Sequence, residues 1–202
     1  MNRRHAVKNI AFLMGGALSA TTIGVFLDSC NPPSDKKGAS LFSSEQDLVI
    51  TELADTIIPT TKTPGAKAAG VGPFISMMMA ECYPKDAQDV FVKGLDDLEA
   101  RSKKEFNNSF AKISAEERKQ LVGKLRDETI ETLKKDNEQA EKDKAANKEP
   151  KKNPNFFAMA RDLTLLGYFT SEIGATKAYE YVEIPGRYDG CVDLKPGQRV
   201  YV

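Results

Sequence analysis

Apolar side chains recur along this chain at the spacing of helices that bury one face. The first such segment follows Ser43, which is positioned to cap a helix together with Gln46, and it stops at Pro59. The apolar positions between them follow the i, i+3, i+4, i+7, i+8 pattern: Ile50, Leu53, Ala54, Ile57 and Ile58. We therefore predict a helix that begins at Ser43 and buries this row.

Three further helices are predicted before residue 134. One has Pro73 in its first turn, stops at Pro84, and carries Phe74, Ile75, Met78, Met79 and Cys82. A second covers residues 86–106 and buries Phe91, Leu95 and Leu98. A third starts at the capping box of Ser114 and Glu117 and buries Leu121, Leu125 and Leu133.

The stretch 134–153 is a polar insertion that consists mostly of Lys, Glu, Asp and Asn. Two interpretations stay open, a solvated helix end or a disordered loop. Beyond it Pro154 can start a helix whose apolar positions are Phe156, Phe157, Ala160, Leu163 and Leu166. We expect Gly167 to allow close helix packing, and Gly174 to end the segment or mark a kink.

The remaining segment, to Val202, has two Pro-Gly turns and no helical period, which predicts an extended tail folded over the helices. The fold class is therefore mainly α: a single-domain helical bundle at residues 43–202 with an irregular C-terminal tail.

Residues 1–29 have the pattern of an export signal, a basic start followed by an apolar stretch with several glycines. Arg3, Arg4 and Lys8 are similar to the twin-arginine pattern, and an ordinary Sec signal is the alternative. The apolar stretch is also long enough for an uncleaved membrane anchor.

The end of this segment favours cleavage. Leu27 to Cys30 reads LDSC, which resembles a bacterial lipobox and predicts lipidation of Cys30. Residues 30–42 would then be a flexible tether, and the folded part would be periplasmic and anchored to the membrane by lipid.

Removal of the signal changes which chemistry is available. The chain has 29 basic and 29 acidic residues, and the signal contains Arg3, Arg4, Lys8 and Asp28, so no basic excess remains for nucleic acid. The only histidine, His5, is also lost. A chain without His cannot hold a c-type haem through Cys-x-x-Cys-His, form a Ser-His-Asp triad or build a typical zinc site, so we assign no catalytic, cofactor or metal residue.

Cys82 and Cys191 remain after cleavage. In an oxidising compartment they could form a disulfide that closes a long loop. The alternative is two unpaired thiols, one buried on a helix and one near the C-terminus.

Three stretches carry a family resemblance: ELADTIIPTTKTPGAKAAGVGPFI, LTLLGYFTSEIGATKAYEYV and PGRYDGC. Together they resemble the gluconate 2-dehydrogenase subunit 3 family, over essentially residues 43–202. The polar insertion is the departure from the family pattern.

The resemblance implies a small, cofactor-free subunit of a membrane-associated periplasmic dehydrogenase. Its expected partners are a flavoprotein of the glucose-methanol-choline oxidoreductase type, which oxidises a sugar or sugar acid at FAD, and often a multihaem cytochrome c. The small subunit is expected to have no catalytic residues and to support export and stability of the flavin subunit. Twin-arginine export moves folded proteins, which suits a partner that is loaded with FAD before export.

The aromatic segment after the insertion is the candidate partner interface, because Tyr and Phe are enriched in interface cores. The residues of this hypothesis are Leu165, Tyr168, Phe169, Tyr179, Tyr181 and Tyr188. The alternative is that they pack the helices against the tail.

Two other functions compete with the subunit role. An independent glycoside hydrolase could use a pair of carboxylates from Glu172, Glu180, Glu183 and Asp189 without any histidine. A free-standing envelope lipoprotein could act as an interaction module for a different partner.

Overall fold

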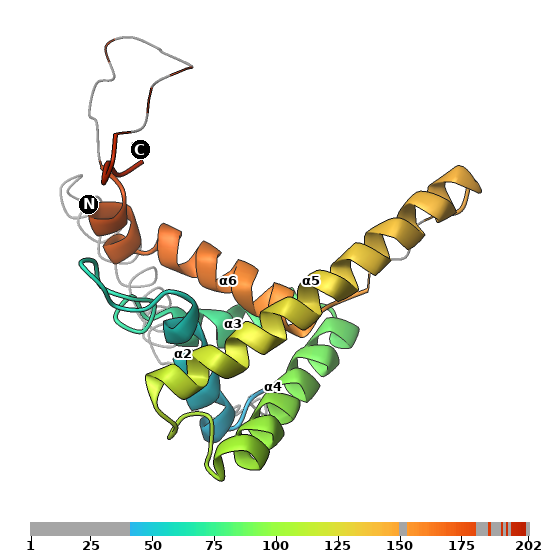
Figure 1. The fold of residues 1–202 in the computed structure, drawn as a ribbon, viewed down its shortest axis with the longest axis horizontal. Coiled ribbons are helices and arrows are strands. Elements are labelled where there is room, and N and C mark those ends of the chain that lie inside the picture. The colour runs from blue at the N-terminus through green and yellow to red at the C-terminus, as the bar shows by residue number, and fades with distance from the viewer. Residues whose placement is uncertain are drawn as a thin grey trace, which may run out of the picture. The chain divides into compact units, whose positions relative to one another are not determined.

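The computed structural model describes residues 41–149, 153–180, 186, 191, 193 and 195–200, all within the compact unit Leu41–Val202. The predicted export signal, with Arg3, Arg4 and Lys8, lies outside the described residues, as does the predicted lipidation site Cys30. The described residues form five α-helices and a short π-helix, arranged as in Figure 1: α2 (Ser44–Ile57), α3 (Val71–Cys82), α4 (Lys85–Phe106), α5 (Ala115–Ala145), α6 (Phe156–Thr170) and η1 (Gly174–Ala178). The mainly α class is confirmed.

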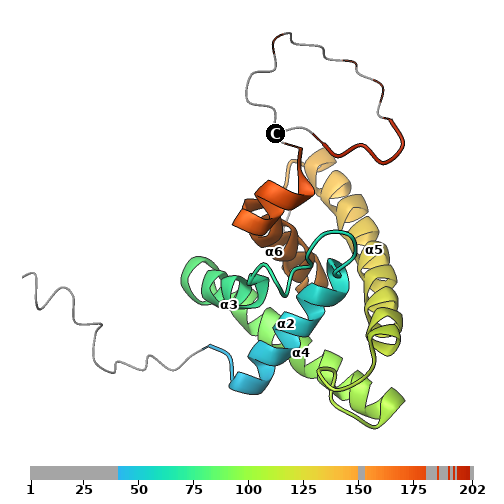
Figure 2. The same cartoon turned by 90° about the vertical axis from the view of Figure 1, so that its left-hand side faces the viewer.

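Helix α2 is one of two central elements: like α6 it contacts α3, α4 and α5, and the two helices contact each other (Figure 2). It begins as predicted: the Ser43 hydroxyl accepts a hydrogen bond from Gln46 N, and the Gln46 side chain accepts one from Ser43 N. Ile50 and Leu53 are buried as expected, whereas Ile57 and Ile58 are only half-buried. The predicted buried row therefore weakens over the last turn of the helix.

The core is centred on aromatic rings from separate helices. Phe91 of α4 is fully buried and meets Phe42 and Phe156 edge-on, with ring centroids 5.7 and 5.1 Å away. Gly94 brings α4 close to α6, because a Cβ there would lie 2.1 Å from Cγ of Phe156. The predicted α4 row of Phe91, Leu95 and Leu98 is confirmed.

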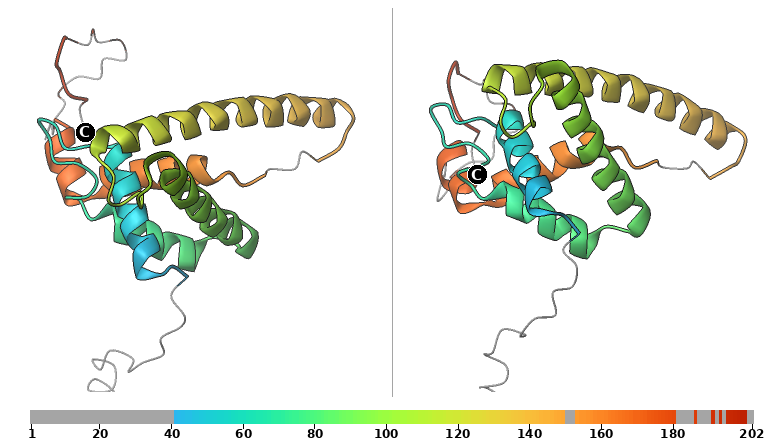
Figure 3. Two further views of the ribbon diagram at one scale, coloured as in Figure 1. Left: turned by 60° about the horizontal axis from the view of Figure 1, so that its bottom comes forward. Right: turned by 90° about the horizontal axis from the view of Figure 1, so that it is seen from below.

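Helix α5 settles the interpretation of the polar insertion as far as residue 149. The helix continues to Ala145, so the solvated helix end is correct for residues 134–145. In Figure 3 its distal part extends beyond the other helices. The Ser114 and Glu117 capping box is present and Leu121 is buried, while Leu125 and Leu133 are only partly buried.

The predicted core face of α6 needs a correction. Leu166 is 47% exposed, and the buried positions near it are Thr164, Gly167 and Tyr168. Gly167 has the predicted role, because a Cβ there would lie 2.5 Å from Cδ1 of Phe74 on α3. Leu166, one position earlier in the helix, is turned about 100° away from this contact.

The tail is described only in part. Backbone N of Glu180 donates to the carbonyl of Val200 at 2.9 Å, and Arg199 donates to the carbonyl of Lys177 at 2.8 Å. The described end of the tail therefore returns to η1. The extended path of the rest of the tail stays a prediction, because most of its residues lie outside the described ones.

Candidate partner-docking surface

The outward side of α6 carries an apolar patch near its C-terminal end. Asn155 caps the helix by accepting a hydrogen bond from Ala158 N at 3.0 Å, which fixes where the helix starts and therefore which side faces the core. Leu165, Leu166 and Phe169 are 40, 47 and 36% exposed on the side away from the core. Large side chains that share an exposed face are a signal for an interaction site, whereas isolated ones are ordinary.

The chain turns after Thr170 so that Tyr179, the residue that follows η1, adds an aromatic ring to this patch. Ser171 Oγ donates to the Tyr168 carbonyl at 2.6 Å and accepts from Gly174 N at 3.0 Å. Only glycine fits at position 174, because a Cβ there would lie 1.8 Å from that same carbonyl oxygen. The turn places Tyr179 with its ring centroid 5.1 Å from that of Phe169.

We call the four residues Leu165, Leu166, Phe169 and Tyr179 the α6 surface. It contains three of the residues predicted for the partner interface and one that the sequence argument assigned to the core, Leu166. Helical spacing alone did not distinguish Leu166 from the core positions, because neighbouring residues lie only about 100° apart on a helix and either one can border the buried face.

Tyr168 does not belong to this surface, so its assignment to the interface was wrong. It is 2% exposed, and its hydroxyl donates to the Pro64 carbonyl at 2.7 Å. Its ring packs edge-on against Phe169, with centroids 5.2 Å apart. Tyr181 and Tyr188 lie outside the described residues.

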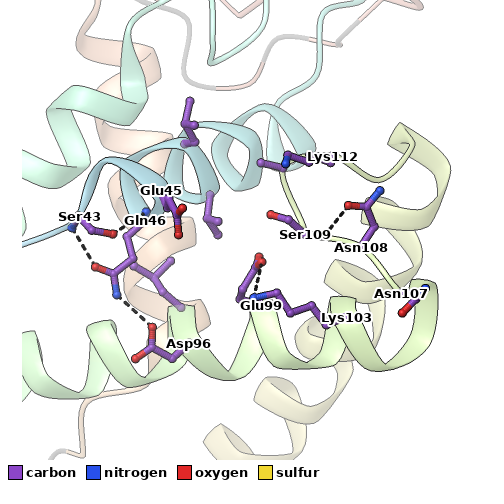
Figure 4. A pocket seen from close by; sticks show the side chains of 14 residues that line it. Ser43, Glu45, Gln46, Asp96, Glu99, Lys103, Asn107, Asn108, Ser109 and Lys112 are labelled. Atoms are coloured by element: carbon purple, nitrogen blue, oxygen red, sulfur yellow. Dashed lines mark hydrogen bonds and ion pairs between the residues drawn. The ribbon is translucent and has the colours of Figure 1, made fainter.

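A polar cleft between the start of α2 and the end of α4 is the second candidate (Figure 4). Its volume is about 1090 Å³, and it is lined by Ser43, Glu45, Gln46, Leu48, Val49, Leu95, Asp96, Glu99, Lys103, Asn107, Asn108, Ser109, Ala111 and Lys112.

The principal polar groups of the cleft already bond to one another. Gln46 donates to Asp96 at 3.0 Å, and Glu99 pairs with Lys103 at 3.3 Å while accepting from Phe110 N at 3.0 Å. A polar ligand would have to displace these bonds, so the cleft is better explained as a structural contact between two helices.

A charged cluster joins α2, α5 and the connection between α2 and α3. The carboxylate of Glu52 on α2 pairs with Arg118 on α5 and, at 2.5 Å, with Lys67 of the connection between α2 and α3. The side chains of Glu52 and Arg118 are only 11 and 17% exposed, and Nε of Arg118 is buried without a partner. Buried charges of this kind are costly unless they stay paired, so we assign the cluster a structural role.

The cysteines are both free and exposed in the structure. Of the two alternatives for Cys82 and Cys191, the unpaired thiols are therefore the one present, although Cys82 is not buried as that alternative supposed. It lies at the last position of α3, on the same side of the helix as Ile75 and Met79, but at the exposed end of that face.

The carboxylates considered for glycoside hydrolysis have no shared site in the described part of the chain. Glu172 and Glu180 are exposed on either side of η1, and Glu183 and Asp189 lie outside the described residues. Among the residues that the structure describes, no group of three or more His, Cys, Asp or Glu side chains could hold a metal ion.

A family model shows which protein family the chain belongs to. The family model for gluconate 2-dehydrogenase subunit 3 matches residues 44–186, which is more than half of the chain. The chain belongs to this family. No curated protein and no solved structure matches it.

Subunit 3 is by its name one component of a multi-subunit dehydrogenase, which agrees with a small helical domain whose clearest surface feature is an apolar patch. No helix within the described ranges is long and apolar enough to cross a membrane.

Proposed function

We propose that this subunit 3 protein is a non-catalytic accessory subunit that binds a flavin dehydrogenase of the glucose-methanol-choline type through the α6 surface. The observation that supports this most is the match to the subunit 3 family over residues 44–186. The α6 surface gives the role a location on the molecule.

The composition of the α6 surface suits a protein partner. Its core is aliphatic and aromatic, and interface centres are depleted of charge and enriched in Tyr and Phe. The exposed leucines and the phenylalanine place apolar surface in water. Burying that surface against a partner would stabilise the complex by about 25 cal/mol per Å² of apolar area removed from water. The buried face of the same helix holds its backbone in place, so docking would need little ordering.

The proposed complex works in the periplasm, with Cys30 lipidated as its membrane anchor. Arg3, Arg4 and Lys8 would direct twin-arginine export of this chain together with the folded, FAD-loaded flavin subunit. FAD would belong to the flavin subunit and haem c, in complexes that contain it, to a cytochrome subunit. We assign no cofactor to this chain, whose contribution would be to export and stabilise its partner.

A free-standing envelope lipoprotein that binds a different protein remains the alternative. It would use the same apolar surface but would not co-purify with a flavoprotein.

The experiment is affinity purification of the tagged full chain from its native membranes in mild detergent, followed by an absorption spectrum and identification of the co-purifying chains. The proposal predicts a flavin spectrum and an oxidoreductase chain of the glucose-methanol-choline type. A colourless preparation of this chain alone, or a partner without flavin, would contradict it.

A further inference from the structure

The connection between α2 and α3, which we call the 58–70 loop, is held unusually firmly for a segment without regular structure. Inside the loop, Ala66 N donates to the Ile58 carbonyl at 2.9 Å, and Thr61 N donates to the Thr63 carbonyl at 3.0 Å. Thr60 Oγ1 accepts from Gly65 N at 3.0 Å. The loop therefore satisfies many of its backbone groups by itself, as a preformed turn does.

Gly65 makes this compact path possible. A Cβ on it would lie 2.5 Å from Thr60 N and 2.8 Å from the Ile58 carbonyl oxygen, so no larger residue fits without moving the backbone. Gly65 and Ala66 are buried, while Thr60, Thr61 and Lys62 at the tip of the loop are exposed.

Two contacts fix the loop to the rest of the fold. The hydroxyl of the buried Tyr168 on α6 donates to the Pro64 carbonyl at 2.7 Å. On the other side, Lys67 pairs with Glu52 on α2, a carboxylate that Arg118 also holds. The loop is thus attached to α2, which precedes it in the chain, and to α6, which lies far from it in sequence.

The loop is also continuous with the α6 surface. Pro64 touches Tyr168, whose ring lies edge-on to Phe169, and Phe169 in turn meets Tyr179. A single side chain therefore separates the loop from the apolar patch. A partner that covers Phe169 would have the loop at the border of its footprint.

We propose that the 58–70 loop is a preordered polar rim of the docking surface, and that Lys62 at its tip faces a carboxylate of the flavin subunit. This inference rests on the proposed function. Lys62 is exposed and has no ion pair among the described residues. An apolar centre with a polar, solvated rim is the usual anatomy of an interface, and a rim charge mainly sets the association rate and its salt dependence.

In this proposal the hydrogen bonds inside the loop lower the entropy cost of binding the partner. A flexible loop would have to lose conformational freedom when the partner binds, which weakens affinity. The Tyr168 hydroxyl and the Glu52 cluster hold the loop in position before the partner arrives.

The test uses the full chain and the purified, FAD-containing flavin subunit, with association rates measured at two salt concentrations. Lys62→Glu should slow association by about tenfold at low salt, and the difference should shrink at high salt. The matched control is Lys104→Glu at the end of α4, another exposed lysine without an ion pair in the described chain, which should associate as the wild type does.

A second variant tests the loop rather than its charge. Tyr168→Phe removes only the hydroxyl that bonds Pro64, and we expect affinity to fall by about threefold to tenfold, the equivalent of one net hydrogen bond.

Wild-type kinetics in both variants would overturn the proposal for the loop while leaving the subunit role intact. If the wild-type chain itself fails to bind the flavin subunit, the proposed function fails and the loop proposal with it.

Discussion

Gly167 of α6 and Phe74 of α3 pack so closely that any side chain at position 167 would overlap the phenylalanine ring. A Cβ would lie 2.5 Å from Cδ1 of Phe74. Gly167→Ala should therefore destabilise the fold by about 1–3 kcal/mol, the usual cost of overpacking. Thermal unfolding checks this.

The control for this substitution lies in α5. Gly123 is inside the helix, and a Cβ there would meet no atom within 4 Å. Gly123→Ala should stabilise by about 0.5–1 kcal/mol, because alanine favours the helix. Equal effects of the two substitutions would show that α3 and α6 are not packed as described.

The Glu52 cluster gives the second prediction. Glu52→Gln removes the charge that pairs with the largely buried Arg118, and the unfolding free energy should fall by about 3 kcal/mol. Glu45→Gln, an exposed acid on the same helix, should change it by less than about 0.5 kcal/mol. Denaturant unfolding of both variants measures the difference, and a mild effect of Glu52→Gln would mean that Arg118 is solvated.

The loss of folding stability at acid pH should depend in part on the N-terminal cap of α5. Hydrogen bonds from the hydroxyl and backbone N–H of Ser114 lower the pKa of Glu117. A lowered pKa in the folded state means that the ionised carboxylate stabilises the fold above the unfolded pKa of about 4.3, and that this contribution is lost as the pH falls through the folded value.

Ser114→Ala should therefore reduce stability at neutral pH by about 1 kcal/mol and reduce its loss between neutral pH and pH 3. Urea unfolding as a function of pH measures both. Parallel pH profiles for the two proteins would contradict the assignment of this cap to Glu117.

The two cysteines should react as free thiols. Cys82 and Cys191 are exposed and unpaired. A maleimide reagent should label both in the folded, unreduced chain, and intact mass would show two additions for a chain whose Cys30 thiol is lipidated. An unlabelled chain that gains both additions only after reduction would mean that the disulfide forms.

The parts of the fold that were predictable from sequence are those determined by residues close together in the chain. Ser43 with Gln46, and Ser114 with Glu117, carry their capping signals within one helical turn, and both helices begin where those pairs predict. The row of Phe91, Leu95 and Leu98 was equally clear, because its members recur at helical spacing within one segment.

The parts that failed depend on contacts between distant segments. Leu166 matched the helical spacing, but Gly167 and Tyr168 occupy the core side because α3 and Pro64 pack there. Arg118 and Glu52 are 66 positions apart, and nothing local in either segment indicates their pairing. Tyr168 was placed in the interface for the same reason, because the sequence alone does not distinguish an aromatic residue in a core from one at a docking site.

The docking role is tested most directly by replacing the two exposed leucines of α6. Leu165→Gln with Leu166→Gln should leave the melting temperature nearly unchanged, because these side chains are 40 and 47% exposed. Leu48→Gln, on a 58% exposed leucine of α2, is the matched control.

The measurement is the dissociation constant of each full-length variant for the purified flavin subunit. The α6 double variant should bind at least about tenfold more weakly than the wild type, as expected when the centre of an interface is disrupted, while the Leu48 variant should bind normally. Wild-type affinity in the α6 double variant would contradict the proposal that this surface docks the flavin subunit.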